Sequence, residues 1–197
     1  MTRATIRVAC RLGLSPERLF EAWLAPGTAC KWLFASASRP LAHAEIDARI
    51  AGGFRFIEAD HGDAIEHTGK YIEIERPRRL VFTLHAGRHL PVATRVIVEI
   101  VPVGRHSHVT VIHENLPVEE ANRMECRWTG MLYGLGVSLA GRNGRAAPVL
   151  FRKGPMRGAR SRHAVLAPAR DRAMSKSGLP QRLQNAANIQ GDTRCDS

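Results

Sequence analysis

The chain has 197 residues and a formal net charge of +11, with 29 Lys and Arg against 18 Asp and Glu. This length suits one domain with or without a tail, and the absence of any run of about 18 apolar residues argues against a membrane span. Residues 1–140 carry 17 basic and 15 acidic side chains and residues 141–197 carry 12 and 3, so the high charge is no argument that the first part binds nucleic acid.

The first elements expected along the chain are a strand and two short helices. Residues 4–12 alternate weakly between apolar and polar side chains, which predicts a strand. Ser15 and Pro16 suit the N-cap and the first turn of a helix, which Pro26 and Gly27 would end. A second short helix is expected at about residues 28–33.

A series of short strands follows. Alternating residues predict strands at about 42–50, from 54 onward, 68–74, 80–84, 92–103 and 108–115, with Gly52 and Gly53 in the first turn. Strands at such short spacing indicate an antiparallel meander. One face of such a sheet needs an apolar cover.

The cover is expected from a long helix at residues 118–140. Apolar side chains recur there at steps of three and four, which is the period of one helix face; they are Ala121, Met124, Trp128, Met131, Leu132, Leu135 and Leu139. Pro117 suits the start of this helix and Gly141 its end. We expect the Trp128 indole, in the middle of the stripe, to be buried against the sheet.

An ordered set of short motifs accompanies these elements: Trp23, Asp47-Ala-Arg49, Phe54-Arg-Phe56, Gly69-Lys-Tyr71-Ile-Glu73, Pro77-Arg-Arg-Leu80-Val-Phe82, His113-Glu-Asn-Leu-Pro117 and Trp128. With this order the chain resembles the helix-grip (START/SRPBCC, birch-pollen-allergen-like) superfamily over about residues 3–140. Within it, the chain is similar to bacterial proteins named for homology to the activator of the heat-shock-protein-90 ATPase. It departs from their usual pattern at Ala51 and Arg127, where they have glycine.

The resemblance implies an α+β helix-grip fold. A curved antiparallel sheet of about six or seven strands would wrap around the long C-terminal helix, with two short helices after the first strand. Residues 1–141 would form this domain. Residues 142–197 form a basic tail with one aromatic residue, Phe151, and we expect it to be disordered.

The resemblance also implies a cavity between the sheet and the last helix that takes a small, mainly apolar ligand. The candidates to line it are Trp23, Trp32, Phe34, Phe54, Tyr71, Phe82, His113, Trp128 and Tyr133. Taken alone, each of these fits an ordinary core side chain better than a ligand contact, and the cavity is argued from the set as a whole. Tyr71 and His113 are expected to line one shared cavity and to supply its polar contacts.

Other candidate sites have simpler interpretations. His106 and His108 would point to one face of a strand and His113 to the other, so no metal site is expected, and no cofactor either. Asp47 with Arg49, and Glu73 with Glu75, share strand faces and suit solvated positions. No nucleophile elbow, P-loop or dinucleotide motif is present, so serine or cysteine catalysis has no positive support.

Three functions remain open from the sequence. The first is an accessory or regulatory ligand-binding domain, the second a cyclase- or hydrolase-like enzyme of the same superfamily, and the third a co-chaperone-like interaction protein. The basic tail would attach weakly to nucleic acid or anionic surfaces, or would have no selected function. The scattered Cys10, Cys30, Cys126 and Cys195 predict reduced thiols and a cytoplasmic location.

Overall fold

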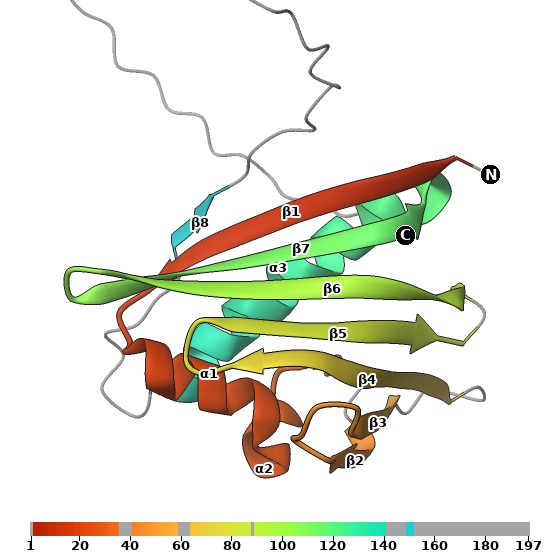
Figure 1. Cartoon of the computed structure of the whole chain (residues 1–197). Helices are drawn as coiled ribbons and strands as arrows, with labels where there is room; N and C mark the ends of the chain where they lie inside the picture. The colour runs from red at the N-terminus through yellow and green to blue at the C-terminus, as the bar shows by residue number, and fades with distance from the viewer. Residues whose placement is uncertain (1, 36–40, 59–63, 88, 141–148, 152–197) are drawn as a thin grey trace, which may run out of the picture. The chain divides into compact units, whose positions relative to one another are not determined.

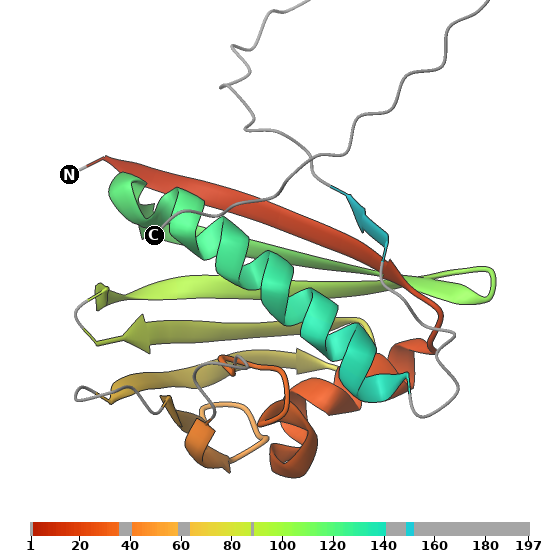
Figure 2. The ribbon, with the colours of Figure 1, turned by 180° about the vertical axis from the view of Figure 1, so that it is seen from behind.

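An antiparallel sheet of eight strands forms one layer, and a long helix lies diagonally across one of its faces (Figures 1 and 2). The strand order is β2-β3-β4-β5-β6-β7-β1-β8. The strands are β1 (Arg3–Leu12), β2 (Leu41–Ile46), β3 (Gly53–Glu58), β4 (Ile65–Glu75), β5 (Arg79–Ala86), β6 (Leu90–Val103), β7 (His106–Pro117) and β8 (Val149–Phe151). The helices are α1 (Pro16–Leu24), α2 (Pro26–Ala29) and α3 (Ala121–Leu139), the last preceded by a 3-10 turn, η1 (Val118–Glu120).

This structure is a computed structural model that describes residues 2–35, 41–58, 64–87, 89–140 and 149–151. The described residues belong to one unit, Met1–Pro155. A second unit, Met156–Ser197, lies outside the described residues, and so does most of the predicted tail. None of the described helices is long and apolar enough to cross a bilayer.

The core lies between the sheet and α3. On β7, buried Ser107, Val109, Val111 and His113 alternate with half-buried residues, as a strand with one covered face requires. The predicted stripe of α3 supplies the opposing surface, and its central residue Trp128 is fully buried. The predicted α+β arrangement, with two short helices after the first strand, is therefore what the structure shows.

Helix α1 is tied to the far end of α3. Ser15 caps α1 by accepting a hydrogen bond from the Arg18 backbone N–H, and Leu19, Phe20 and Trp23 face the core. The Arg18 guanidinium donates to the Leu139 carbonyl at 2.8 Å, which satisfies one of the carbonyls left free at the C-terminus of α3.

The sequence placed the end of β2 too late. The strand ends at Ile46 rather than near residue 50, and Ile50 is 65% exposed. Residues 47–52 instead form a turn in which the Gly52 N–H donates to the Arg49 carbonyl. Ala51 has a φ of +66° there, which is the left-handed region that glycine adopts most readily. This explains why a glycine is expected at that position.

Two further boundaries and one strand differ from the prediction. Helix α2 spans Pro26–Ala29 rather than residues 28–33, and α3 begins at Ala121, because the residues before it form the 3-10 turn. Strand β8 was missed. It pairs with β1 beyond residue 141, the predicted end of the domain, and a strand of three residues is too short to show a period in the sequence.

Gly69 on β4 is the position where an added side chain is least tolerated. A Cβ there would overlap the Thr83 carbonyl oxygen on β5 and would lie 2.5 Å from Cζ of Phe54 on β3. We expect Gly69→Ala to lower the free energy of unfolding by about 1–3 kcal/mol or more, because neighbouring strands must separate. Urea denaturation measures this, with Gly27→Ala as control, since a Cβ at Gly27 meets nothing within 4 Å. Equal midpoints for the two variants would contradict the close approach at Gly69.

Candidate functional site

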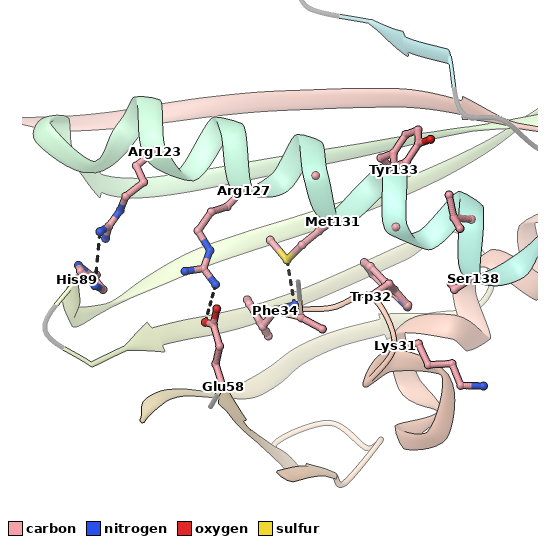
Figure 3. Close-up of a pocket in the computed structure, with 14 residues that line it drawn as sticks. Lys31, Trp32, Phe34, Glu58, His89, Arg123, Arg127, Met131, Tyr133 and Ser138 are labelled. Carbon is pink, nitrogen blue, oxygen red and sulfur yellow. Dashed lines mark hydrogen bonds and ion pairs between the residues drawn. The ribbon is translucent and has the colours of Figure 1, made fainter. Parts of the chain in front are cut away.

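An open groove of about 1010 Å³ runs along the flank of α3 (Figure 3), and we call it the α3 groove. Helix α3 forms one wall with residues between Arg123 and Ser138. The opposite wall comes from three separate segments: the stretch after α2, the end of β3 at Glu58, and the turn between β5 and β6 at His89. The groove therefore exists only because segments distant in sequence meet beside the helix.

The floor of the α3 groove is apolar, and part of its outer edge is apolar too. Trp32, Phe34 and Met131 line it with side chains that are 5% exposed or less. Tyr133 and Val137 line it too, although they are 53% and 56% exposed. Large apolar side chains left exposed beside a concave surface are typical of a binding site.

Two glycines one turn apart on α3 shape the groove. A Cβ at Gly134 would lie 3.4 Å from the Trp32 Cβ, so this glycine lets Trp32 pack closely against the helix. A Cβ at Gly130 would meet nothing within 4 Å, although Gly130 lines the groove. The backbone of α3 is thus accessible to a ligand at Gly130.

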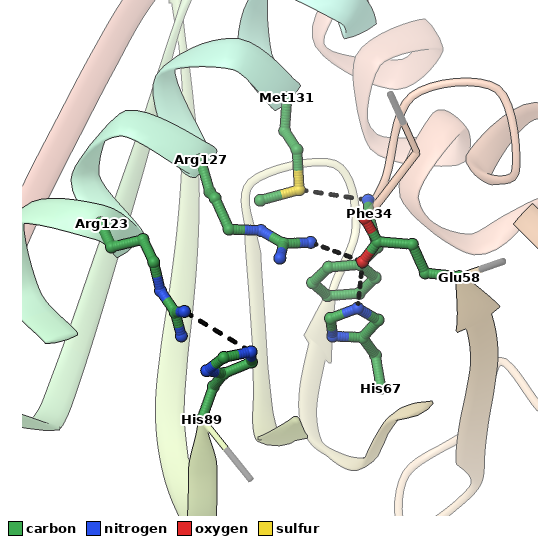
Figure 4. Close-up of polar contacts among 7 residues, drawn as sticks. All are labelled: Phe34, Glu58, His67, His89, Arg123, Arg127 and Met131. Carbon is green, nitrogen blue, oxygen red and sulfur yellow. Dashed lines mark hydrogen bonds and ion pairs between the residues drawn. The ribbon is translucent and has the colours of Figure 1, made fainter. Parts of the chain in front are cut away.

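A buried polar cluster lies beneath one end of the groove (Figure 4). Oε2 of Glu58 accepts hydrogen bonds from Nε2 of His67 at 3.0 Å and from Nη2 of Arg127 at 2.9 Å. The side chains of Glu58 and His67 are each 3% exposed, and that of Arg127 is 25% exposed. The imidazole of His67 stacks on the Phe34 ring with centroids 4.3 Å apart.

The protonation states in this cluster follow from its burial. Burial lowers the pKa of His67, with Glu58 opposing that effect only in part, so His67 is neutral at pH 7. Burial alone would raise the pKa of Glu58, but the hydrogen bond from His67 and the charge of Arg127 outweigh it and lower the pKa. Glu58 is thus an ionised carboxylate, compensated by Arg127. Among the described residues, Nδ1 of His67 has no hydrogen-bond partner.

Phe34 connects this cluster to the helix. Its φ is +60°, a conformation that costs about 1–3 kcal/mol for a residue with a side chain and persists where the surroundings hold it. Here the stacking on His67 holds the ring, and the Phe34 N–H donates to Sδ of Met131 at 3.2 Å. The strained residue therefore fixes the wall opposite α3.

The predicted site residues separate into three environments. Trp32 and Tyr133, together with Phe34, line the α3 groove. A second group lines a small void of about 10 Å³ within the aromatic core, and its members are Trp23, Phe54, Tyr71 and Phe82. That void is about the size of one water molecule. The third group, His113 with Trp128, lines neither of these two hollows.

His113 forms a hydrogen-bonded chain inside the core. The Trp128 indole N–H donates to Nδ1 of His113 at 3.1 Å, and Nε2 of His113 lies 2.7 Å from Oγ1 of Thr94. Because the Thr94 hydroxyl donates to the Leu84 carbonyl, Nε2 carries the proton. Both ring nitrogens are therefore satisfied internally. Of the two hollows, Tyr71 lines the small void and His113 lines neither, so a cavity shared by Tyr71 and His113 stays a prediction.

Sequence reasoning missed the polar residues of the site, above all Glu58 and His67. A signal was present, since Glu58 continues the inward alternation of Phe54 and Phe56, and His67 follows inward-facing Ile65. A carboxylate at an inward strand position must find a partner. Arg127 was noted only as a departure from the usual glycine.

The remaining candidates behave as surface or core residues. His106 and His108 are half-buried on one face of β7 and His113 is buried on the other, as predicted, and no group of three metal-ligating side chains occurs among the described residues. Asp47 and Arg49 form an exposed ion pair at 2.8 Å. Glu73 pairs with Arg79 at 3.0 Å.

Comparison with known proteins gives a family. A family model described as "Activator of Hsp90 ATPase homolog 1-like protein" matches residues 14–140, which is more than half of the chain. The chain matches none of the curated proteins.

Several solved structures share the fold. Protein CV1439 from Chromobacterium violaceum is 23% identical, with a TM-score of 0.63 over 68% of this chain and 94% of that one. Mll3558 from Rhizobium loti is 22% identical, with a TM-score of 0.61 over 70% and 98%. An AHSA1-like protein from Aeromonas hydrophila is 17% identical, with a TM-score of 0.59 over 70% and 94%. At these identities the likeness establishes the architecture alone.

Proposed function

The chain belongs to the activator of Hsp90 ATPase homolog 1-like family, and we propose that it binds a small, mainly apolar molecule in the α3 groove, in an accessory or regulatory role. The observation that carries the proposal is the groove itself. It combines a floor of Trp32, Phe34 and Met131 with a few polar groups at one end. Its volume of about 1010 Å³ matches the upper range of small-molecule sites.

The proposed site lies beside α3 and not deep under the sheet. The cavity expected from the family resemblance lay among the core aromatics, where the void lined by Trp23, Tyr71 and Phe82 measures about 10 Å³. Of the residues proposed from the sequence, Trp32, Phe34 and Tyr133 remain candidates for ligand contact. Trp128 supports the site from behind as part of the core.

A second candidate function is an enzyme of the cyclase or hydrolase kind. The buried Glu58–His67 pair supports it, because both groups have shifted pKa values and Glu58 lines the groove with His67 bound behind it. The pair also has a structural explanation, since it fixes the Arg127 side chain, and that role requires no catalytic reaction. The co-chaperone-like alternative gains less support, since the exposed apolar side chains outside the groove are distributed over several elements, with Ile72 on β4, Val101 and Val103 on β6, and Val118 in η1.

We place the protein in the cytoplasm. The support is that Cys10 and Cys30 are free thiols, as expected for a reducing compartment. Burial raises the pKa of the Cys10 thiol to about 12, so it stays protonated and unreactive at neutral pH.

Gly130→Leu should block the groove and lower the affinity for an apolar probe at least about tenfold. A leucine there occupies space that is open in the groove, and it favours the helix by about 1 kcal/mol relative to glycine, so the fold is retained. The measurement is fluorescence titration with the neutral probe N-phenyl-1-naphthylamine. Asn122→Leu is the control, because it adds the same side chain to an exposed position of α3 outside the groove.

Equal probe affinity in the wild type and in both variants would contradict the proposed site. Native mass spectrometry of protein purified from cells complements the titration. A small molecule retained by the wild type and absent from Gly130→Leu would identify the natural ligand.

A further inference from the structure

We propose that the natural ligand is an amphiphilic monocarboxylate, with its carboxylate at the Arg123–Arg127 end of the α3 groove and its apolar body along Trp32, Met131 and Val137. The inference rests on the proposed function of the groove and adds the chemical class of the ligand.

The two ends of the groove differ in chemistry (Figure 3). Arg123 and Arg127 lie one turn apart on the same face of α3, with His89 and Glu58 opposite them. Toward the C-terminus of α3 the walls become mostly apolar, formed by Trp32, Met131, Tyr133 and Val137, with Lys31 and Ser138 at the margin. A ligand that satisfies both ends needs one polar head and an apolar body.

The polar end is richer in hydrogen-bond donors than in acceptors. Oε2 of Glu58 already accepts from both His67 and Arg127. Arg127 directs one nitrogen, Nη2, at Glu58, while a guanidinium has five N–H donors in all. The charged side chains that line the groove are Lys31, Arg123 and Arg127 against Glu58. The complementary head group is therefore an anionic acceptor, and a carboxylate matches the forked guanidinium geometry.

Charge compensation favours one negative group in addition to Glu58. Arg127 balances the buried Glu58 carboxylate, so Arg123 is the main cation that faces a ligand head group. Arg123 is 41% exposed, and its Nη1 lies 3.5 Å from Nε2 of His89. Its ion-pair partner Glu120 does not line the groove, so a ligand carboxylate would share Arg123 with Glu120. A carboxylate between the two guanidinium groups can thus bind Arg123 without displacing Glu58 from Arg127.

The guanidinium of Arg127 is already fixed in position before a ligand binds. Glu58 is fixed by His67, and His67 is fixed by the stacked Phe34 ring. Because this support is already ordered in the free protein, little side-chain entropy is lost when a ligand binds. The apolar wall continues from Arg127 to Val137, which is about 15 Å along a helix at 1.5 Å per residue, so an extended alkyl or aryl-alkyl body fits.

The test is a series of probes that share one body and differ in head charge. Decanoate, decan-1-ol and decylammonium are each used to displace N-phenyl-1-naphthylamine from the full-length protein. We expect decanoate to displace the probe at a concentration at least about tenfold below that of decan-1-ol. Decylammonium should be the weakest of the three, because it meets two guanidinium groups.

Two variants locate the preference in the groove. Arg123→Gln removes the exposed cation, and Arg127→Lys keeps a positive charge beside Glu58 but loses the forked geometry. Each should reduce the preference for decanoate over decan-1-ol to about threefold or less, with the affinity for decan-1-ol unchanged. Arg105→Gln, at an exposed turn outside the groove, is the charge-matched control and should keep the full preference.

The possible outcomes distinguish an error in the carboxylate assignment from an error in the proposal that the α3 groove binds a ligand. Equal displacement by decanoate and decan-1-ol, with both abolished by Gly130→Leu, would overturn the carboxylate assignment and leave groove binding intact. The carboxylate assignment would also be overturned if Arg105→Gln lost the preference for decanoate to the same extent, or if the unmutated protein lost it in about 0.5 M salt. In either case the preference would come from the net charge of the chain. Displacement that Gly130→Leu does not alter would overturn the groove and the proposed function together.

Discussion

Trp128→Ala should lower the free energy of unfolding by about 3–5 kcal/mol. The indole is fully buried beneath α3 and packs against Trp23, with ring centroids 6.2 Å apart, and against Phe34, also at 6.2 Å. Alanine would leave a large void at the point where helix and sheet meet. It would also remove the donor to Nδ1 of His113, so a buried acceptor would lose its partner.

Urea denaturation at pH 7 measures this loss, with Trp128→Phe as the matched variant. Phenylalanine keeps most of the apolar volume and loses the N–H, so we expect a smaller loss of about 1–3 kcal/mol, the cost of an unsatisfied buried group. An unchanged midpoint for Trp128→Ala would show that α3 does not pack on the sheet through this residue.

Acidification from pH 7 to pH 5 should lower the free energy of unfolding by about 2 kcal/mol through His113 alone. Burial lowers the pKa of His113 from 6.5 to about 3. Between these two values the unfolded chain takes up a proton that the folded chain does not, so the free energy of unfolding falls as the pH falls. The slope is about 1.4 kcal/mol per pH unit for one proton. The hydrogen-bonded chain explains why the folded protein disfavours protonation of His113, because a proton on Nδ1 would face the Trp128 N–H.

The Glu58–His67 pair acts in the same direction. Burial lowers the pKa of His67, so the unfolded state is favoured once the pH falls below the ordinary value for histidine. The pKa of Glu58 is lowered as well, and the stability that its ionised form contributes is lost as the pH falls through its pKa in the folded protein. All three groups therefore make the fold less stable in acid.

Urea denaturation at pH 7 and pH 5 tests the dependence. His113→Gln should be less stable than the wild type at pH 7 but should lose less stability between the two pH values, since the titrating group is gone. His85→Gln, at a partly exposed site on β5 outside the chain formed by Trp128, His113 and Thr94, should keep the wild-type difference. A pH difference in His113→Gln as large as in the wild type would show that His113 is not the source.

The sequence predicted the parts of the fold that depend on local pattern. Alternation on β7 and the three-and-four spacing on α3 indicated which faces are buried, and Trp128 lies in the core as expected. A side chain's face is set by the geometry of its own element, so nearby residues are sufficient to predict it. Where the backbone leaves regular geometry, as at Ala51 and in the turn before α3, the predicted boundaries were off by a few residues.

The candidate site depended on tertiary structure. The sequence identified aromatic residues that face inward, but whether Tyr71 and Phe82 fill the core or Trp32 and Tyr133 line a groove depends on which surfaces meet. Glu58, His67 and Arg127 come from β3, β4 and α3, and Arg127 follows Glu58 by 69 positions in the sequence. Hydrogen bonds and packed volumes are relations between such distant segments. Periodicity can assign each residue to a face, but only the packing of one face on another determines where space is filled and where it stays open.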